Sequence, residues 1–476
     1  MERSIAQTAC KVVEKVLEAI EAIGFSRIGE TTDAILGVLK EGTLELVSTG
    51  IREMDEAVLL AKKERRVNGL TVKARKVPRT VTTSCGELTY YRTYYQLKDG
   101  SKAYLVDQLI GIEPYERVTK ELCARLLQRS AQESLQRAAE SLGNPVTKQT
   151  VDNRLLSMKQ VGTEIERKEE TPKELHVFAD EDHVHVRKLN HSVIVPLVTL
   201  TEGIDTSNPK RHRTIHPVYF QGYGMENESF IDNVTAAIYR RYDMDQVERI
   251  CIHADGGQWI RKFGSILPKA VFIMDGYHLE KHLKQLFRLP GAGNYGGVIR
   301  KAVRNDDFDS FVRYCSKISE KLEGKDLGTL DELVNYFQNN WESIVERERK
   351  EHCGSCTEAL VSHVLSKRLS RDPLGWTEEG LAKMSMLRVY TQNGGTVKAS
   401  DIRVSRSKEQ RKQDLTSLEN GLEIYNRYAE EQVRSAFGKA HDWSIFEPKR
   451  VSFGKVTGTT VLLNACARLR DLDSLS

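Results

Sequence analysis

The spacing of apolar residues divides the chain into a helical beginning, a strand-rich middle and a helical later part. In residues 1–60, apolar positions such as Val12 and Val16 recur every three or four residues, which is typical of amphipathic helices. A second stretch of this kind follows Gly24, around residues 34–39. We therefore predict an N-terminal helical region over 1–60 that serves packing or assembly.

The strand-rich part begins near residue 172, where short runs of apolar and β-branched residues replace the helical spacing. These runs predict strands at Leu175–Asp180, Val184–Val186, Val193–Leu200, Ile215–Phe220, Val247–Ala254 and Ala270–Met274, and helices at Phe230–Tyr242, Trp259–Ile266 and Leu279–Leu286. The first four runs make three or four strands of a meander. The resulting order, β-β-β-α-β-α-β-α, matches an α/β RNase H-like core, which we expect over 172–286. Pro196 is a mild objection, because proline in a sheet is usually confined to edges or bulges.

The core pattern is interrupted over residues 287–352. A glycine-rich run at 291–297 precedes charged helical stretches such as Leu330–Phe337. We expect a helical insertion here, after which the final helix region of the core follows at 353–395. The remaining residues, 396–476, are expected to form a basic, helical C-terminal region.

A cluster of basic residues precedes a predicted β-hairpin in the region 61–110. Residues 80–95 combine β-branched and aromatic side chains around Gly86, which is typical of a hairpin. Eight Lys or Arg and one acid, Glu64, give the preceding segment a local charge of +7; the basic residues are Lys62, Lys63, Arg65, Arg66, Lys73, Arg75, Lys76 and Arg79. We expect this region to contact DNA phosphates. A solvated charged face beside an ordinary hairpin is the competing interpretation.

Residues 111–165 contain a pattern typical of a helix-turn-helix DNA-binding domain. A helix from Leu135 leads to a turn at Gly143, and Thr147 is placed to cap a second helix. At the start of that helix, where recognition helices meet base edges, lie Lys148, Gln149, Thr150 and Asn153. The pattern also occurs in proteins that do not bind DNA. We expect a mainly α N-terminal DNA-binding region that contains both the hairpin and this motif.

Length and composition agree with several folded domains. At 476 residues, the chain implies roughly three domains of about 100–200 residues each. Its net charge is only +4, so affinity for nucleic acid has to come from local clusters of Lys and Arg. The eight cysteines show no disulfide framework, and we find neither a signal-peptide pattern nor an apolar run of membrane-spanning length. We expect a cytoplasmic protein without a membrane role.

Three acidic residues occur in the order in which an RNase H-like fold would present its catalytic carboxylates. Asp180 ends the first predicted strand, Asp255 follows the strand Val247–Ala254, and Glu358 opens a helix-like stretch. A carboxylate at the end of an apolar strand is costly unless it binds a cation or forms a pair. Two divalent ions held about 3.5–4 Å apart by such groups activate an attacking oxygen and stabilise a leaving oxygen at one phosphorus.

Neighbouring acids leave this assignment open. Strand alternation would place Asp182 on the face of Asp180, and Glu181 is a further competitor. Glu348 and Glu351 are alternatives to Glu358. Most of the 67 acidic residues must serve as solvated surface groups or ion pairs.

Two smaller motifs accompany the acidic residues. Asp275 and His278 lie three residues apart at a predicted strand-to-helix junction, either as an N-cap beside a surface histidine or as groups that support the metal site. Cys353 and Cys356 have the spacing of half a zinc site, but a second Cys-x-x-Cys is missing from the sequence. A Walker sequence is also missing, which argues against an ATP-driven step.

Several segments together resemble the motif blocks of ISLre-type bacterial insertion-sequence transposases. The blocks are Ala179–Val184, His253–Ile260, Met274–His278 and Glu358–Thr377, accompanied by Arg79–Arg92 and Tyr104–Asp107. The resemblance covers most of the chain. It departs from the family pattern at Ala359, where glycine is expected, and in the turn at residues 371–375.

The resemblance implies that Asp180, Asp255 and Glu358 form a DDE triad that binds two Mg²⁺ or Mn²⁺ ions. Asp275 and His278 would form the Asp-x-x-His motif that follows the second Asp. Trp259, His363 and Arg368 lie within the same blocks and are expected to support the site.

The implied activity is metal-dependent cleavage and strand transfer of an insertion sequence by a bacterial, nucleoid-associated protein. Its partners would be double-stranded DNA, as terminal repeats and target, and a second copy of the chain, because two ends must be brought together. Further phosphate contacts are expected at Lys210–Arg213 and at Arg403, Arg406, Lys408, Arg411 and Lys412. The alternatives are a structure-selective nuclease and a non-catalytic DNA-binding regulator derived from a transposase.

Overall fold

The computed structural model describes residues 2–25, 27–141, 143, 145–189, 191–208, 213–255, 257–349, 356–371, 375–403, 424 and 426. The chain forms two compact units. Unit 1 comprises Met1–Cys123, Ala139–Thr147 and Val404–Ser476, and unit 2 comprises Ala124–Ala138 and Lys148–Arg403. Most of the region expected over 396–476 therefore lies outside the described residues.

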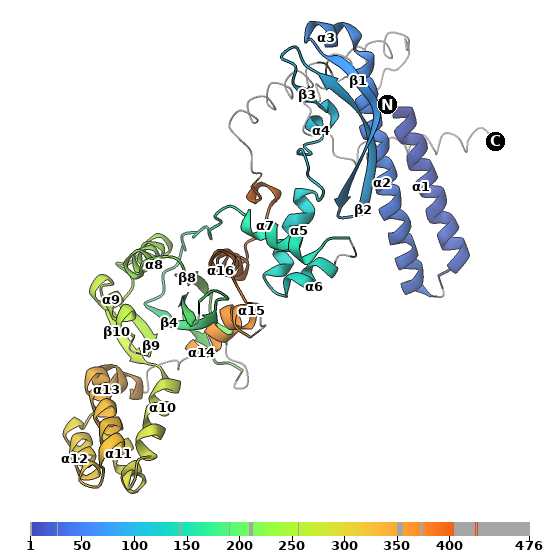
Figure 1. Ribbon diagram of the computed structural model, residues 1–476. Helices are drawn as coiled ribbons and strands as arrows, with labels where there is room; N and C mark the ends of the chain where they lie inside the picture. The colour runs from blue at the N-terminus through green and yellow to red at the C-terminus, as the bar shows by residue number, and fades with distance from the viewer. Residues whose placement is uncertain are drawn as a thin grey trace. The chain divides into compact units, whose positions relative to one another are not determined.

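Unit 1 begins with two long helices, where the apolar spacing predicted helices. Helix α1 (Glu2–Ile23) packs along α2 (Ile28–Leu60), as Figure 1 shows. A side chain larger than hydrogen at Gly42 would collide with Val12, so this glycine allows the two helices to approach closely. Several large apolar side chains on the pair are about half exposed: Val13 at 52%, Leu17 at 54%, Leu36 at 49% and Leu39 at 44%.

A three-stranded antiparallel sheet follows in unit 1. Strands β1 (Thr71–Thr83) and β2 (Gly86–Gln96) form the predicted hairpin, and β3 (Lys102–Ala103) pairs with β2. Short helices flank the sheet: α3 (Lys62–Val67) before it and α4 (Leu105–Leu109) after it.

Asp107 of α4 lies buried against this sheet. Its carboxylate accepts hydrogen bonds from the Tyr90 hydroxyl at 2.7 Å and from Arg79 Nη1 at 2.8 Å, and it pairs with Arg92 as well. The Arg92 guanidinium also stacks over the Tyr104 ring, 3.5 Å from its centroid. Two cations therefore surround one buried anion.

Three helices lie in the region of the predicted helix-turn-helix: α5 (Lys120–Ser130), α6 (Leu135–Glu140) and α7 (Lys148–Leu156). The division between the two units passes through α5 and α6. Helix α7 belongs to unit 2, where its Val151 and Leu155 are buried. The DNA-reading role of this segment stays a prediction.

The centre of unit 2 is a five-stranded mixed sheet in the order β10-β9-β4-β5-β8. Strands β4 (Glu174–His185), β5 (Ser192–Thr201) and β8 (Val218–Gln221) pair antiparallel, whereas β9 (Arg249–Ala254) and β10 (Ala270–Met274) run parallel to β4. A separate pair of short strands is formed by β6 (Ile204–Asp205) and β7 (Arg213–Thr214).

The strands differ from the predictions in two places. The runs Leu175–Asp180 and Val184–Val186 belong together, because β4 continues through the acidic segment between them as far as His185. The run expected from Ile215 forms a strand only from Val218. Pro196 is accommodated because β8 pairs only with Leu197–Leu200, so the proline lies beyond the end of that neighbour.

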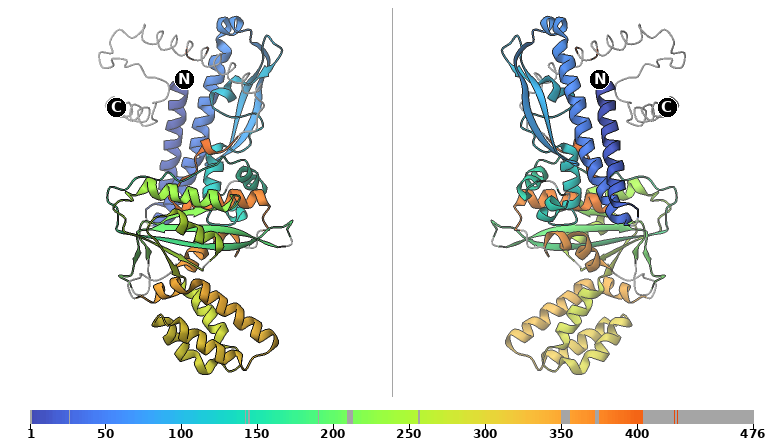
Figure 2. Two further views of the ribbon diagram at one scale, coloured as in Figure 1. Left: turned by 90° about the vertical axis from the view of Figure 1, so that its left-hand side faces the viewer. Right: turned by 90° about the vertical axis from the view of Figure 1, so that its right-hand side faces the viewer.

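Helices cover both faces of this sheet (Figure 2). On one face, α8 (Asn227–Arg241) and α9 (Gln258–Ile266) bury the alternate β4 residues Leu175, Val177 and Ala179. The opposite face meets α14 (Thr357–Val361), a π-helical turn η2 (Ser362–Ser366), α15 (Lys367–Leu369) and α16 (Glu378–Gln392). Because side chains alternate along a strand, His176, Phe178, Asp180 and Asp182 all lie on this second face.

The expected insertion is a helical subdomain with its own core. It begins earlier than the expected bounds of 287–352, because α10 (Gly276–Phe287), expected in the sheet core, packs in it. Its other elements are η1 (Ala292–Tyr295), α11 (Gly296–Arg304), α12 (Phe308–Ser319) and α13 (Gly324–Glu348), drawn in yellow to orange in Figure 2. Leu283, Phe311 and Phe337 are among its buried residues. The predicted helical stretch Leu330–Phe337 is part of one longer helix, α13, which packs on β10. A last 3-10 turn, η3 (Ala399–Asp401), precedes the undescribed part.

Within the described residues, the model has no helix with the length and hydrophobicity needed to span a bilayer.

Candidate active site

Asp180, Asp255 and His278 meet at one end of the central sheet. Strands β4 and β9 are parallel neighbours in which Phe178 lies opposite His253, so Asp180 and Asp255, two residues further along, lie side by side. His278 comes from the first turn of α10, which follows the next strand, β10. One ligand atom from each of the three side chains lies within 4.8 Å of the others. This distance is short enough for one cation to contact all three.

Glu358 reaches the same cluster from the first turn of α14. Its Oε1 atom lies 3.2 Å from Nε2 of His278, although the two residues are 80 positions apart in the sequence. The Glu358 side chain is half exposed, and that of His278 is 18% exposed. The three acids proposed from the sequence are therefore gathered around one histidine.

The electrostatic environment of Asp180 favours a bound cation. Burial, together with the nearby carboxylates of Glu358 and Asp255, raises the pKa of Asp180 to about 7. The backbone N–H of Glu181, which donates to Asp180 Oδ1 at 2.8 Å, offsets only part of this effect. A divalent ion at the cluster would favour the ionised carboxylate and remove the repulsion.

Asp275 has a positioning role. It is buried and caps α10, because its Oδ1 accepts the backbone N–H groups of Tyr277 at 2.9 Å and His278 at 3.3 Å. Its own N–H donates to the carbonyl of Ala254, immediately before Asp255. The N-cap interpretation of this residue therefore describes its contacts, and the cap fixes the helix turn that carries His278.

The rival acids on β4 are engaged elsewhere. Asp182, on the same face as Asp180, accepts hydrogen bonds from Ser366 at 3.0 Å and Ser370 at 3.1 Å, which tie β4 to the helices above it. Glu181 accepts the indole N–H of Trp259 at 2.6 Å. Trp259, which was expected to support the site, therefore contacts Glu181 and not Asp180 through its indole N–H. The geometry favours Asp180 as the member of the cluster.

Of the two alternatives to Glu358, the described one is also engaged elsewhere. Glu348 lies 3.9 Å from Arg304 within the insertion, in an ion pair. Glu351 lies outside the described residues, as does Cys353, whereas Cys356 is partly buried just before α14.

Two expected supporting residues, His363 and Arg368, contribute to the fold around the site. Arg368 is buried, donates from Nε to the carbonyl of Ser130 at 2.7 Å and lies 4.9 Å from the centre of the Trp376 ring. The His363 side chain is exposed, and its backbone carbonyl accepts a hydrogen bond from Arg388. No contact to Asp180 or Asp255 is found for either side chain among the described residues.

Tyr336 of α13 is a neighbour of the site that the sequence did not indicate. Its hydroxyl donates to the backbone carbonyl of Asp255 at 3.4 Å, and burial raises its pKa. The ring of His282, one helical turn after His278, lies 4.0 Å from the Tyr336 ring, and burial lowers the pKa of His282. Spacing along α10 points to His282, but no sequence pattern connects Tyr336 with a residue 81 positions away.

A cavity of about 430 Å³ is lined by Glu181, Gly257 and Trp259, and the backbone N–H of Gly257 donates to Asp255 Oδ1 at 2.9 Å. Its other walls come from β5 and from the segment between β8 and α8, and they are Ile194, Pro196, Gly222, Tyr223, Gly224, Met225 and Asn227. The site therefore has a mixed aromatic and apolar hollow on one side.

The residues expected to contact DNA are either exposed or turned inward. The exposed ones are Lys62, Lys63, Arg66, Lys73, Arg75 and Lys76 in unit 1, and Lys148, Gln149 and Asn153 on α7 in unit 2. Arg65 and Arg79 instead point inward: Arg65 Nη2 donates to the Leu59 carbonyl at 2.7 Å, and Arg79 pairs with Asp107. In this conformation we correct their assignment from phosphate contact to structural support.

The more distant basic candidates are only partly visible. Arg213 and Arg403 are exposed. The remaining ones, residues 210–212 together with Arg406, Lys408, Arg411 and Lys412, lie outside the described residues.

Comparison with known proteins finds similarity to an uncharacterised family. The model of an uncharacterised protein family, UPF0236, matches residues 24–406. Three similar relatives are UPF0236 proteins of Caldanaerobacter subterraneus subsp. tengcongensis. The first is 32% identical over 381 residues, which cover 78% of both chains. The others are 33% identical over 387 residues, covering 78% of this chain and 78% or 74% of the relative. The name of the first joins eleven designations and that of the second four.

Proposed function

This chain belongs to the uncharacterised protein family UPF0236, and from its acidic site we propose that it is a metal-dependent DNA transposase. The observation that carries the proposal is the convergence of Asp180, Asp255, His278 and Glu358 from four separate segments of the chain. Acidic groups crowded until one has a pKa of about 7 are a costly arrangement, which a bound cation would relieve.

The sheet topology supports an RNase H-like interpretation. Within the five-stranded sheet, the antiparallel strands β4, β5 and β8 come first in the chain. Strands β9 and β10 are parallel to β4 and are added on its other side. Asp255 follows the carboxyl end of β9, where sheets of this kind commonly place their ligands, and Asp180 lies just past the part of β4 that pairs with β9. The third acid is provided by a late helix, α14.

The donor set suits the expected ions, because carboxylate oxygens are the ligands that Mg²⁺ and Mn²⁺ prefer. Asp180 and Asp255 would hold an ion between them, and Glu358 would complete a second position. Bound there, two ions would activate an attacking oxygen and neutralise the charge on a leaving oxygen. His278, held by the Asp275 cap and bonded to Glu358, would orient the scissile phosphate.

The chemistry would proceed in two steps at the same carboxylates. Water attacks the phosphorus at the element end, the P–O3′ bond breaks, and the 3′ oxygen leaves with a proton as a hydroxyl. That 3′-hydroxyl then attacks a phosphorus of the target strand, displacing the target's own 3′ oxygen. Neither step requires a covalent bond between protein and DNA, or ATP.

Two further observations support a mobile-element protein. Exposed Lys and Arg side chains cluster on α3 and β1, as a phosphate-binding surface requires. Several designations joined in one relative's name are what a protein encoded at several places in one genome would carry. Repeated copies are the expected product of transposition.

Pairing two element ends calls for two copies of the chain, and the α1–α2 pair offers a surface for this contact. Its half-exposed Val13, Leu17, Leu36 and Leu39 provide apolar area that a second copy would bury. Sedimentation of the wild type and of Leu17→Glu tests this part: we expect a dimer for the former and a shift toward monomer for the latter.

The decisive experiment is cleavage and joining of labelled DNA that carries the flanks of this gene's own element, with Mg²⁺ or Mn²⁺. We expect joined product from the wild type and none from Asp255→Asn. Asp182→Asn is the matched control, because it removes a buried acid from the same sheet face without touching the cluster, and it should retain joining.

Each other outcome has a distinct meaning. Cleavage without joining would indicate a structure-selective nuclease, and binding without cleavage in both proteins would indicate a regulator. Cleavage that survives in Asp255→Asn would overturn the proposed site.

A further inference from the structure

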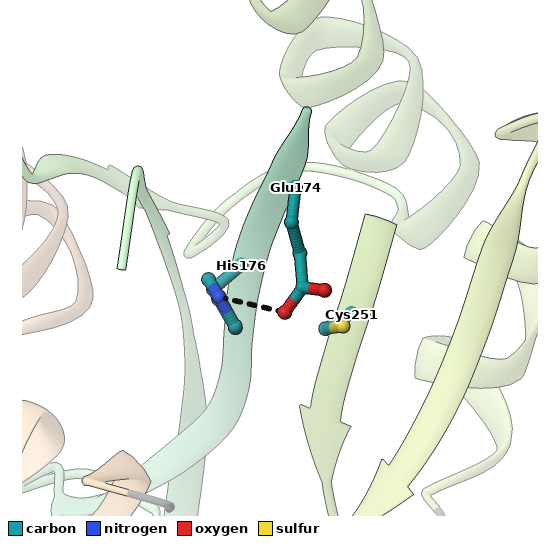
Figure 3. A group of neighbouring side chains, drawn as sticks. All are labelled: Glu174, His176 and Cys251. Carbon is teal, nitrogen blue, oxygen red and sulfur yellow. Dashed lines mark ion pairs between the residues drawn. The ribbon is translucent and has the colours of Figure 1, made fainter. Parts of the chain in front are cut away.

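A second group of side chains with metal-binding potential lies at the opposite ends of the same two strands. It consists of Glu174 and His176 on β4 and Cys251 on β9. One ligand atom from each lies within 4.8 Å of the others. Figure 3 shows the Glu174 carboxylate lying between the His176 ring and the Cys251 sulfur. None of the three has a part in the proposed transposase chemistry.

Strand pairing fixes this group. His176 and Cys251 are direct partners in the parallel β4–β9 register, and Glu174 precedes His176 by two residues, so all three share one face. His176 and Cys251 are buried, at 4% and 0% exposure, whereas the Glu174 side chain is 37% exposed. The group therefore has two ligands anchored in the sheet and one at its open side.

The surroundings of His176 prepare it to bind a metal ion. Its Nδ1 lies 3.0 Å from Nε2 of His253, while its Nε2 faces the Glu174 carboxylate at 3.2 Å. Its ring is also stacked on those of Phe178 and His253. A metal-binding histidine usually donates its other ring N–H to a nearby acceptor, which fixes ring orientation and tautomer. His253 provides such an acceptor, and Nε2 would then carry the lone pair.

We propose that Glu174, His176 and Cys251 bind a divalent transition-metal ion of the Zn²⁺ class. A thiolate, an imidazole and a carboxylate form a donor set that suits Zn²⁺, whereas Mg²⁺ prefers oxygen alone. The ligands of a tetrahedral zinc ion are roughly 3.5 Å apart, so side-chain movements of about 1 Å would close the site. Binding would release the thiol proton of Cys251 to solvent, and water would occupy the fourth position.

This site is separate from the acidic cluster. His176 and Asp180 are four positions apart, as are Cys251 and Asp255, which corresponds to roughly 13 Å at about 3.3 Å per residue. A bound ion would tie together the two strands that deliver the catalytic acids. The proposal does not depend on the activity of the protein, since it concerns metal binding alone.

Titration of the purified full-length protein with Co²⁺, in excess Mg²⁺ that saturates oxygen ligands, tests the proposal. We expect one equivalent of Co²⁺ to give the visible absorption of a tetrahedral ion and a near-ultraviolet band from the cobalt–thiolate bond, both removed by Zn²⁺. Cys251→Ser should lose the near-ultraviolet band. Cys315→Ser is the matched control, because Cys315 is equally buried but lies in the helical insertion, and it should keep the band.

Two milder variants keep the test valid if Cys251→Ser folds poorly. Glu174→Gln alters a partly exposed side chain and should weaken Co²⁺ binding. His253→Gln, which removes the ring next to His176, should weaken binding about 10–100-fold. If Co²⁺ gives no thiolate band with the wild type, or the same band with Cys251→Ser, the proposal is wrong. The three groups would then form only a hydrogen-bonded chain with His253.

Discussion

Acidic side chains in the two units of this protein have opposite electrostatic surroundings. In unit 1, buried Asp107 is surrounded by Arg79, Arg92 and the hydroxyl of Tyr90. In unit 2, Asp180 and Asp255 face each other and a histidine, and their hydrogen bonds in the described part of the chain come from backbone N–H groups.

The difference lies in how each charge is balanced. The charge of Asp107 is balanced within the chain, so it contributes to folding as it stands. The acids at the second site have no such cationic side chain among their described hydrogen-bond donors, and this cost to stability is the basis on which we propose a bound cation there.

Removing the charge at Asp107 should have the largest effect on stability. In Asp107→Asn, the guanidinium groups of Arg79 and Arg92, whose side chains are only 10% and 12% exposed, lose their counterion, so we expect a loss of about 3–5 kcal/mol in the free energy of unfolding. Urea unfolding monitored by circular dichroism measures it. Asp99→Asn, at an exposed turn, should change the stability by less than about 0.5 kcal/mol. Equal effects of the two substitutions would remove the distinction.

Removing the charge at Asp180 should instead increase the stability of the metal-free protein. Its folded pKa of about 7 lies above the unfolded value, so its ionisation lowers stability as pH rises from about 4 to 7. Asp180→Asn should therefore raise the Tm of the metal-free protein above pH 7, by roughly 2–4 °C per kcal/mol gained, and leave it unchanged near pH 4.

Metal ions should reverse the order of these two proteins. With Mg²⁺ or Mn²⁺ added at pH 8, the wild type should gain stability and Asp180→Asn should not, because the variant lacks one ligand. If metal-free Asp180→Asn has a lower Tm than the metal-free wild type at pH 8, the predicted gain in stability is contradicted.

Hydroxyl removal gives a smaller contrast. Tyr90→Phe deletes the 2.7 Å hydrogen bond to Asp107 and should cost about 1 kcal/mol, seen in urea unfolding. Tyr336→Phe deletes only a 3.4 Å contact to the Asp255 carbonyl and should cost less. A larger loss for Tyr336→Phe would mean that the acidic site contributes to the fold as strongly as Asp107 does.

The smallest effect concerns the basic residues of unit 1. Exposed Lys62 and Lys63 should each add about one to the slope of log affinity for DNA against log salt, so the double alanine variant lowers the slope by about two. Filter binding across a salt series measures it. Arg79→Lys is the control. Because Arg79 pairs with Asp107 and not with DNA, this variant should leave the slope unchanged.

Some of this architecture was predictable from the sequence. Strand β10 has the predicted bounds, because Ala270–Met274 is a pure apolar run with clear ends. The acidic segment inside β4 hid the length of that strand, since charged residues usually indicate a loop. Here one sheet face carries the site, so acids replace the apolar residues that mark a strand.

The candidate site was predictable only as a set of residues. Asp180, Asp255 and Glu358 could be named, but their convergence through His278 depends on tertiary structure. Charge alone could not separate buried Arg65 and Arg79 from their exposed neighbours, because burial depends on partners distant in sequence. The zinc-type group was missed because its pattern, a histidine two residues after Glu174 and a cysteine on another strand, becomes visible only with the β4–β9 register.

The bond between His278 and Glu358 also has a consequence for the order in which the protein matures. It joins residues that are 80 positions apart, on either side of most of the helical insertion. Contacts of such long range form late in folding. A ribosome makes Asp180 and Asp255 well before Glu358, so the nascent chain carries an incomplete set of ligands until the insertion has been synthesised and folded. The timing of translation therefore delays the assembled site until most of the molecule exists.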